Sequence, residues 1–255
     1  MLKFQAQTLF SNQKKEPVYM STDDFSIGQL GALQLSDSFF PTGMYTTSHG
    51  LEALLYTNRK KIANPRDLLE MIKTYLECQI GPADCTALSN SYSCSERKDL
   101  NGLREIDRTI FSMKLIREIR EASTRSGTQL IRCLVSFITT DEILNNFNES
   151  IKLGSATGVY PVALAIACKA LDISRNNAGM VLLYGFTVSM VGAALRLGML
   201  QHYDGQRIIH ELKPDILSIV RNCINRPLAS MWQFAPAIDI LQIKHEGLNS
   251  KMFIT

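Results

Sequence analysis

Apolar residues recur every three or four positions along most of the chain after residue 25, and this spacing predicts amphipathic α-helices. The clearest stretch runs from residue 103 to 123. Its charged side chains fall opposite an apolar stripe made of Leu103, Ile106, Ile110, Met113, Ile116 and Ile119. A second predicted helix ends before the turn at Pro41–Gly43, and its apolar face consists of Ile27, Leu30, Leu33 and Leu35.

Proline, glycine and short polar residues mark the expected helix boundaries. Asn64 followed by Pro65 predicts a helix start, with asparagine as the cap and proline in the first turn. Gly81-Pro82 predicts the end of that helix and the start of another. Further helices are expected over residues 128–138, after Asp141, and on both sides of a break at Pro214.

Residues 156–174 and 178–195 are rich in small and apolar residues. In the second stretch Gly185, Ser189 and Ala193 are spaced by four, which would let another helix approach closely, so both are predicted to be central, buried helices. The uncharged run from 178 to 195 reaches the lower length limit for a membrane span. Its glycines and hydroxyls, and the missing flanking Lys/Arg cluster, favour a buried core helix instead.

No stretch alternates apolar and polar residues over a convincing strand length. We therefore predict an all-α, single-domain helical bundle over residues 26–246. Residues 1–25 lack periodicity and the apolar core of a signal peptide, so a loosely ordered leader is expected. The tail from 247 to 255 is expected to order on partner binding, because Leu248, Met252 and Phe253 are apolar anchors.

Composition narrows the classes of function. The chain has 255 residues, 45% of them hydrophobic, and a formal net charge of +3. That charge is small and dispersed, so nucleic-acid binding is not expected. The six cysteines form no C-x-x-C pair, which indicates reduced thiols in a cytoplasmic protein. The sequence has no phosphate-binding loop, dinucleotide motif or nucleophile elbow, so we expect no catalytic activity.

Metal-ligand spacing is also missing from the sequence. His202 and His210 could share a helix face, but solvated surface histidines explain them better. Cys78 and Cys85 could likewise share a face, although buried thiols are the simpler interpretation. A helical metal-binding protein or enzyme that uses these groups and His49 stays open as an alternative.

Polar residues of the C-terminal third have structural interpretations. Arg196 ends an apolar helix and is expected to bond its last-turn carbonyl groups. Asp204-Gly205-Gln206 is interpreted as a turn and helix cap. His245-Glu246 beside Asp239 is interpreted as a surface salt-bridge cluster.

Four segments carry more specific motifs. They are LQLSDSFFPTGMYTTSHGLEALL (33–55), EIREASTRSGTQLIRCL (118–134), VSMVGAALRLGMLQHYDGQRIIHELKP (188–214) and FAPAIDILQIKHEGLNSKMFIT (234–255). In this order they closely resemble the segments of the UreF family of urease accessory proteins. Two positions depart from the family pattern. Lys251 stands where arginine is usual, which alters any bidentate pairing, and Met44 stands where glycine or serine is common.

The resemblance implies an all-helical, homodimeric, non-catalytic protein that takes part in urease maturation. Such proteins bind the accessory protein UreD, also called UreH, and the GTPase UreG, and the assembly docks on apo-urease and delivers nickel. No tightly bound cofactor is implied, although nickel in transit could touch the chain. The residues alone also leave open a membrane protein or a helical scaffold unrelated to urease.

The resemblance also assigns candidate partner-binding residues. The UreG side is expected on the loop and helix start from Phe39 to Glu52, at Pro41, Thr42, Gly43, Tyr45, Ser48, His49 and Glu52. The UreD/UreH side is expected at the C-terminal end, at His245, Glu246, Leu248, Lys251, Met252 and Phe253. Structural or interface roles are expected for Arg196, Asp204 and Gln206.

Overall fold

The computed structural model describes residues 26–37, 39–57 and 64–255, and every regular element in these ranges is helical. The all-α prediction is therefore confirmed. The α-helices are α1 (Ile27–Ser36), α2 (Leu51–Thr57), α3 (Pro65–Tyr75), α4 (Thr86–Glu96), α5 (Leu100–Met113), α6 (Arg117–Val135), α7 (Glu142–Lys152), α8 (Tyr160–Ala170), α9 (Arg175–Arg196), α10 (His202–Glu211), α11 (Lys213–Cys223) and α12 (Pro236–Glu246). A π-helix, η2 (Leu76–Cys85), and two 3-10 turns, η1 (Met44–Thr46) and η3 (Leu228–Ser230), complete the set. The predicted leader lies outside the described residues.

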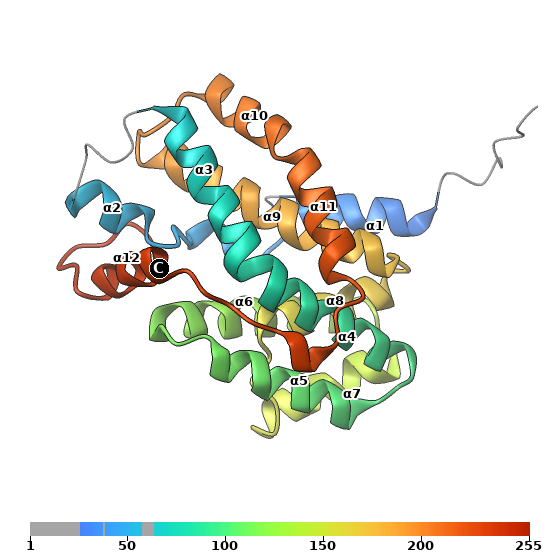
Figure 1. The fold of residues 1–255 in the computed structure, drawn as a ribbon. Helices are drawn as coiled ribbons and strands as arrows, with labels where there is room; N and C mark the ends of the chain where they lie inside the picture. The colour runs from blue at the N-terminus through green and yellow to red at the C-terminus, as the bar shows by residue number, and fades with distance from the viewer. Residues whose placement is uncertain (1–25, 38, 58–63) are drawn as a thin grey trace, which may run out of the picture.

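Helices α8 and α9 form the centre of the bundle (Figure 1). From Pro161 to Cys168 every residue of α8 is buried; α4 and α6 pack against α8, and α1, α10 and α11 pack against α9. Within the described part of the chain, α9 alone is long and apolar enough to cross a membrane, but 67% of its most apolar stretch is buried inside the protein. It is a core helix, as the sequence predicts.

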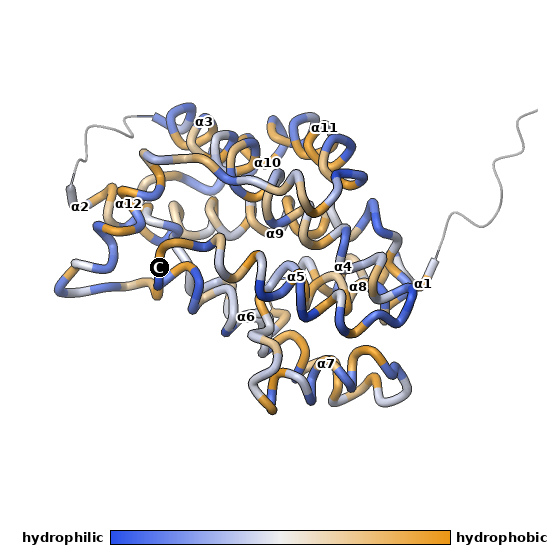
Figure 2. The backbone as a smooth tube through the Cα atoms, turned by 60° about the horizontal axis from the view of Figure 1, so that its bottom comes forward, coloured by the Kyte–Doolittle hydropathy of each residue, from blue (hydrophilic) through white to orange (hydrophobic). Residues whose placement is uncertain are grey.

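The outer helices are amphipathic and capped where the sequence indicates. Hydrophobic and hydrophilic positions alternate around α3 and α7 (Figure 2). The side chain of Asn64 accepts hydrogen bonds from the backbone N–H groups at the start of α3, 2.9 Å from that of Arg66, and Asp141 caps α7 in the same way. These caps satisfy helix N–H groups that have no partner within the helix.

Helix α1 faces inward with its glycines rather than with its large apolar side chains. A Cβ atom on Gly28 would lie 2.1 Å from the carbonyl oxygen of Asp172, so only glycine permits this approach. Gly31 and Leu35 are also buried. The predicted inward face is therefore wrong in three of its four members, because the exposed apolar side chains of α1 are Ile27, Leu30 and Leu33.

The helix that was predicted to end at Gly81-Pro82 continues, because α3 leads into η2 and η2 leads into α4. Proline has no N–H, so in a continuous α-helix the carbonyl group of Cys78, four residues earlier, would have no helical donor. The backbone N–H of Phe234 donates to that oxygen instead, at 2.9 Å. The wider π-helical turn accommodates the proline ring. The predicted break is wrong because a distant segment supplies the missing hydrogen bond.

The stretch from residue 103 to 123 is not one helix, since α5 ends at Met113 and α6 begins at Arg117. Between them the ammonium group of Lys114 pairs with Asp84 at 2.7 Å, and both side chains are more than nine-tenths buried. The backbone of Lys114 leaves the helical conformation, with ψ at 89°. Periodicity placed this lysine on the outer face, and the tertiary ion pair overrides that local preference.

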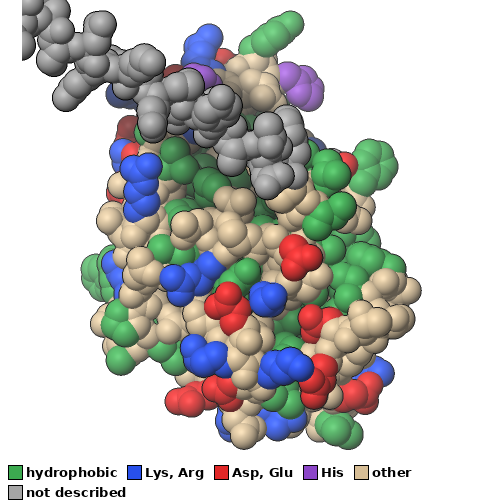
Figure 3. Space-filling view, turned by 90° about the vertical axis from the view of Figure 1, so that its right-hand side faces the viewer, with side chains coloured by type: hydrophobic (Ala, Val, Ile, Leu, Met, Phe, Trp, Pro, Cys, Tyr) green, Lys and Arg blue, Asp and Glu red, His purple; other side chains and the backbone are tan. Residues whose placement is uncertain are grey.

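Charges of both signs are mixed on the face that Figure 3 shows, where Lys and Arg side chains lie among Asp and Glu side chains. This mixture agrees with the small formal net charge of +3. Proteins that bind nucleic acids instead concentrate basic residues on one face. This face therefore does not have the basic concentration of a nucleic-acid-binding surface.

Candidate functional site

Two segments from opposite ends of the chain meet beside α2, next to α12 (Figure 1). The backbone N–H of Ile254 donates to the carbonyl oxygen of Thr46 at 2.8 Å, and that of Ser48 donates to the carbonyl oxygen of Thr255 at 2.8 Å. The Ser48 hydroxyl also donates to Thr255. We call residues 39–52 and 245–255 together the clasp. The two segments that the sequence assigns to different partners thus form one structural unit.

Glu52, on the first turn of α2, lies at the centre of the clasp and is completely buried. Its carboxylate accepts hydrogen bonds from the backbone N–H groups of Met252 at 2.7 Å and Phe253 at 3.1 Å. It also faces Nε2 of His245 at 3.1 Å. A buried carboxylate is costly unless donors surround it. Glu52 therefore holds the C-terminal segment and does not present its side chain to solvent.

His245 lies between two carboxylates and is fully buried. Its Nδ1 is 2.7 Å from Glu118 and its Nε2 is 3.1 Å from Glu52. The ammonium group of Lys251 donates to the second oxygen of Glu118. The interpretation of this histidine as part of a surface cluster is wrong, because its ring pairs with groups on α2 and α6.

Glu118 joins α6 to the C-terminal segment. Burial alone would raise the pKa of Glu118, but hydrogen bonds from Lys251 and His245 outweigh it and hold the pKa below its usual value. The side chain of Glu246 accepts the backbone N–H of Glu118 at 3.0 Å. Lys251, which replaces the usual arginine, thus still makes an ion pair, through a single point charge.

Arg196 connects the clasp to the end of α9. Its guanidinium carbon lies 3.6 Å from the ring centroid of Tyr45 and 4.5 Å from that of Phe253, so both aromatic rings contact the cation. Its Nε also donates to the carbonyl oxygen of Gly192, four residues earlier in α9, at 3.1 Å. Burial lowers the pKa of Arg196. The residue joins the loop, the tail and the core helix.

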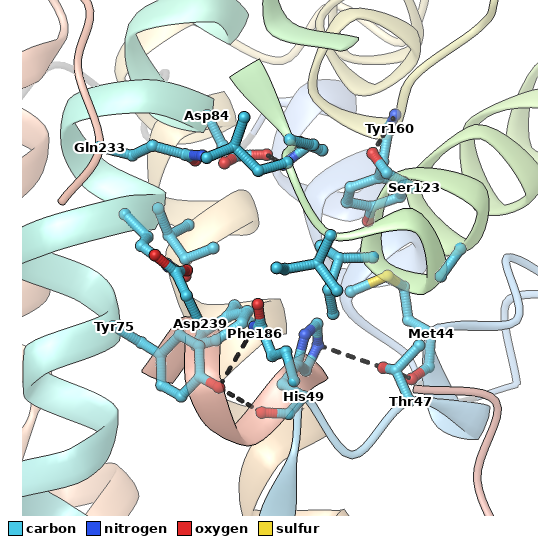
Figure 4. A pocket seen from close by; sticks show the side chains of 18 of the residues that line it. Met44, Thr47, His49, Tyr75, Asp84, Ser123, Tyr160, Phe186, Gln233 and Asp239 are labelled. Atoms are coloured by element: carbon cyan, nitrogen blue, oxygen red, sulfur yellow. Dashed lines mark hydrogen bonds and ion pairs between the residues drawn. The ribbon is translucent and has the colours of Figure 1, made fainter. Parts of the chain in front are cut away.

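His49 ends the loop just before α2 and points into the protein (Figure 4). Its φ of +51° is left-handed, and its carbonyl group accepts a hydrogen bond from the Tyr75 hydroxyl. The ring packs 4.7 Å from that of Phe186, and Nε2 lies 3.2 Å from the Thr47 hydroxyl. Burial, assisted by the charge of Lys114, lowers the pKa of His49 to about 3. The ring is therefore neutral near pH 7.

A cavity of about 70 Å³ lies beside His49, between the loop and helices α3, α6, α9 and α12 (Figure 4). The Asp84–Lys114 pair lines it, and one carboxylate oxygen of Asp84 has no hydrogen-bond partner. Asp239 also lines it, and burial raises its pKa although Gln79 donates to it at 2.8 Å. The cavity is polar on these sides and apolar elsewhere, and it is large enough for water.

The metal-ligand candidates lie apart. His202 and His210 are both exposed on α10. Cys85 is buried, and burial raises the pKa of its thiol. Nowhere in the described residues do three His, Cys, Asp or Glu side chains gather in a way that could hold a metal ion. The side chains described here therefore offer no ligand set for a tightly held metal.

Asp204 and Gln206 lie inside α10, which begins at His202. The predicted turn and cap at these positions are therefore wrong. Between them Gly205 faces α9, where a Cβ atom would be 2.8 Å from a methyl group of Val191. The glycine serves close helix packing rather than a turn.

The candidate partner-binding residues divide by exposure. The exposed ones are Pro41, Gly43, Tyr45, Lys251 and Met252. The partly buried ones are His49, Glu246 and Leu248, and the buried ones are Thr42, Ser48, Glu52, His245 and Phe253. Only the exposed and partly buried residues can contact a partner directly in this conformation. The buried ones shape the clasp from within.

Comparison with known proteins decides the family, because the UreF family model matches residues 62–213. The chain belongs to the UreF family. A urease accessory protein UreF of Trichodesmium erythraeum is 35% identical over 225 residues, which is 88% of this chain and 96% of that protein. UreF 1 of Brucella melitensis is 30% identical and UreF of Bacillus sp. (strain TB-90) 27%, each over 89% of this chain and over 92% and 98% of their own lengths.

UreF proteins are non-catalytic accessory proteins of urease maturation, so this chain takes part in that process. The part matched by the UreF model begins before α3 and ends at the start of α11. Both segments of the clasp, residues 39–52 and 245–255, lie outside it.

Proposed function

We propose that this UreF-family protein is an adaptor that links UreD/UreH to the GTPase UreG while nickel is inserted into apo-urease. Family membership supports the maturation role. One structural observation supports the adaptor role: the clasp joins the two candidate partner surfaces through the buried carboxylate of Glu52. Partners on such a frame would be held at a fixed distance from one another.

The UreG side of the adaptor is proposed on the exposed part of the loop, at Pro41, Gly43 and Tyr45. Tyr45 is 58% exposed although its ring stacks on Arg196. The hydroxyl of Thr46 donates to the carbonyl oxygen of Gly43 at 2.7 Å, so the loop is already folded. A preorganised loop loses little entropy on binding, and an exposed tyrosine suits an interface.

The UreD/UreH side is proposed on the outer face of the C-terminal segment. Met252 is 66% exposed whereas the adjacent Phe253 is 3% exposed, so the segment is anchored inside and presents an apolar side chain outside. Leu248 and Lys251 lie on either side of the turn after α12. We expect UreD/UreH to complete the ordering of residues 247–255, because a partner that binds the docked form stabilises it.

A homodimer is proposed through the groove between α1, the loop and α9. The groove has a volume of about 220 Å³, and its lining includes Leu35, Phe40 and Val188. A Cβ atom on Gly185 would meet nothing within 4 Å, so no described residue packs against α9 at this position. A second copy would cover this apolar groove together with the exposed side chains of α1.

Nickel is proposed as cargo that passes through the assembly to apo-urease. The described residues offer no converging ligand set, so we expect no tightly bound metal on this chain. The cytoplasm is the proposed compartment, because free cysteines stay reduced there.

The test uses Tyr45→Ala with Tyr56→Ala as the matched control, since Tyr56 is 59% exposed on α2. UreG capture by the complex with UreD/UreH is measured at known concentrations, together with the nickel content of the urease. Tyr45→Ala should weaken UreG capture about tenfold or more, as expected of an aromatic hot spot, and keep UreD/UreH binding. Tyr56→Ala should behave like the unmodified protein.

Two outcomes would count against these proposals. Normal UreG capture by Tyr45→Ala would move the UreG surface elsewhere. Failure of the unmodified protein to bind both partners at once would contradict the adaptor role itself.

A further inference from the structure

His245 has a carboxylate at each of its two ring nitrogens. The two carboxylates come from separate helices, Glu52 from α2 and Glu118 from α6, while His245 belongs to α12. The distances are 3.1 Å and 2.7 Å, and the imidazole is completely buried. One ring therefore joins three helices that are far apart in the sequence.

The protonation state of the ring decides whether both contacts are hydrogen bonds. An ionised carboxylate only accepts hydrogen bonds, and a neutral imidazole carries a hydrogen on one nitrogen alone. With a neutral ring, a nitrogen lone pair would face a carboxylate in a site without solvent, which is unfavourable. As long as both carboxylates are ionised, both contacts are hydrogen bonds only when His245 is an imidazolium ion.

The charges that surround the ring lead to the same conclusion. Glu52 from α2 and Glu118 from α6 contribute two negative charges, and Lys251 from the C-terminal segment contributes one positive charge. A protonated His245 makes this group of four side chains neutral, whereas a neutral ring leaves one excess negative charge. Nearby, Glu246 of α12 and Arg117 of α6 lie 4.0 Å apart at the margin of the site.

The same carboxylate that faces His245 also holds the chain end. Glu52 accepts the N–H groups of Met252 and Phe253, so any displacement of Glu52 weakens both contacts. Phe253 in turn stacks on Arg196. If the hydrogen bond between His245 and Glu52 were lost, Glu52 could move, and the whole C-terminal segment would be held less firmly.

We propose that His245 is the positioning residue of the clasp, and that its protonated ring fastens the C-terminal segment to the body of the protein. Docking of the segment then depends on pH. The docked form requires the proton on His245, so docking weakens as the pH rises and the ring becomes neutral. Docking also weakens at acid pH, because protonated carboxyl groups no longer pair with the imidazolium ring. Docking is therefore strongest at intermediate pH.

The consequence for UreD/UreH rests on the proposed function, whereas the fastening is a property of this chain alone. A pH-dependent tail with unchanged UreD/UreH affinity would contradict the proposed UreD/UreH surface and leave the fastening intact. If docking of the tail depended neither on pH nor on His245, the fastening role of His245 would be contradicted. The proposed UreD/UreH surface would not be affected by that result.

The first test observes the ring nitrogens directly. Nitrogen–proton correlation spectra of the ¹⁵N-labelled full-length protein should show both nitrogens of His245 protonated at pH 7. His202 and His210, which are exposed, serve as internal references in the same spectra. A neutral His245 ring at pH 7 would overturn the proposal.

The second test measures amide hydrogen exchange of Met252, Phe253 and Ile254 between pH 6 and pH 9, corrected for the intrinsic exchange rate. Protection should fall about tenfold or more across this range, the equilibrium effect of losing one charge-assisted hydrogen bond. Protection of α8 amides, measured in the same samples, should not change with it. Protection of the three amides that does not depend on pH would overturn the proposal.

Variants separate the fastening role from a general loss of stability. His245→Gln should lower protection of the three amides at pH 6 and remove its pH dependence, while the matched variant His210→Gln should change neither. If His245→Gln fails to fold, Glu118→Gln provides the same comparison with the histidine retained, and should also weaken the pH dependence. Unchanged protection and pH dependence in the folded variant would overturn the proposal.

Discussion

The centre of the bundle and the clasp are both buried, but different kinds of contact hold them. Around α8 and α9 the interior is almost entirely apolar, and residues such as Leu164 and Leu183 are fully or almost fully enclosed. In the clasp the enclosed side chains include Glu52 and His245. Apolar contacts are numerous and have no preferred direction, whereas the clasp relies on a few directional hydrogen bonds.

This difference shows that burial alone does not say what a residue does. Leu183 and Glu52 are both 0% exposed. An apolar side chain of similar volume could replace the leucine at little cost. No other side chain could replace the glutamate, because it has to accept two backbone N–H groups and face an imidazole at the same time. Substitutions in the two regions should therefore differ in kind.

The largest effect is expected in the core. Leu183→Ala should lower the free energy of unfolding by about 2–5 kcal/mol, because it removes buried methyl groups and leaves a cavity. Denaturant titration followed by circular dichroism measures it. Leu217→Ala, at a leucine that is 42% exposed on α11, should cost much less. Equal losses in the two variants would contradict the location of the core.

The second effect tests the clasp. Glu52→Gln should destabilise docking of the C-terminal segment by about 1–3 kcal/mol, because a weaker acceptor faces donors that stay buried. The loss should appear as faster amide exchange at Met252 and Phe253, with little change in α8. Glu211→Gln, at an exposed position of α10, is the control. A uniform loss of protection throughout the protein would mean that the clasp and core unfold together.

The sequence predicted the core because local patterns encode it. The caps at Asn64 and Asp141 contact residues only a few positions away along the chain. The small apolar residues of α8 and α9 likewise form a pattern that is visible within one helix. The prediction failed wherever a distant group intervened. Phe234 supplies the hydrogen bond that lets the helix pass Pro82, and Asp84 draws Lys114 into the gap between α5 and α6.

The clasp could not be predicted for the same reason. The hydrogen bond of His245 with Glu118 joins residues 127 positions apart, and that of Ser48 with Thr255 joins residues 207 positions apart. No periodic pattern shows that His245 meets Glu52. The resemblance to UreF proteins singled out both segments as candidate partner surfaces. It did not show that they touch, nor that Ser48, Glu52 and His245 lie inside. An isolated histidine and glutamate in separate amphipathic helices look like surface residues until the fold brings them together.

A smaller effect is expected where the clasp meets the core helix. Arg196→Lys should weaken docking of the loop and tail by about 0.5–2 kcal/mol, because an ammonium group cannot stack flat on Tyr45 and Phe253 as a guanidinium does. Amide exchange at Thr46 and Ile254 measures it. Arg207→Lys, exposed on α10, should have no effect. If Arg196→Lys also had none, the two ring contacts would contribute nothing to docking.

The smallest effect is expected on the stability of the protein at acid pH, where Glu118 becomes protonated. Hydrogen bonds from Lys251 and His245 hold the pKa of Glu118 below its usual value against the opposing effect of burial. A carboxylate with a lowered pKa stabilises the folded protein above its ordinary titration range, and this contribution disappears as the pH falls through the lowered value. Glutamine at this position resembles the protonated acid. The stability difference between the unmodified protein and Glu118→Gln should therefore be largest at neutral pH and shrink steadily below pH 5, as measured by thermal unfolding at each pH. In a Lys251→Met background the same stability difference should be smaller at neutral pH, because Glu118 no longer accepts a hydrogen bond from Lys251. A difference that stays constant from pH 7 to pH 4 would show that Glu118 acts through packing alone, and the clasp would then resemble the core more closely than its charges indicate.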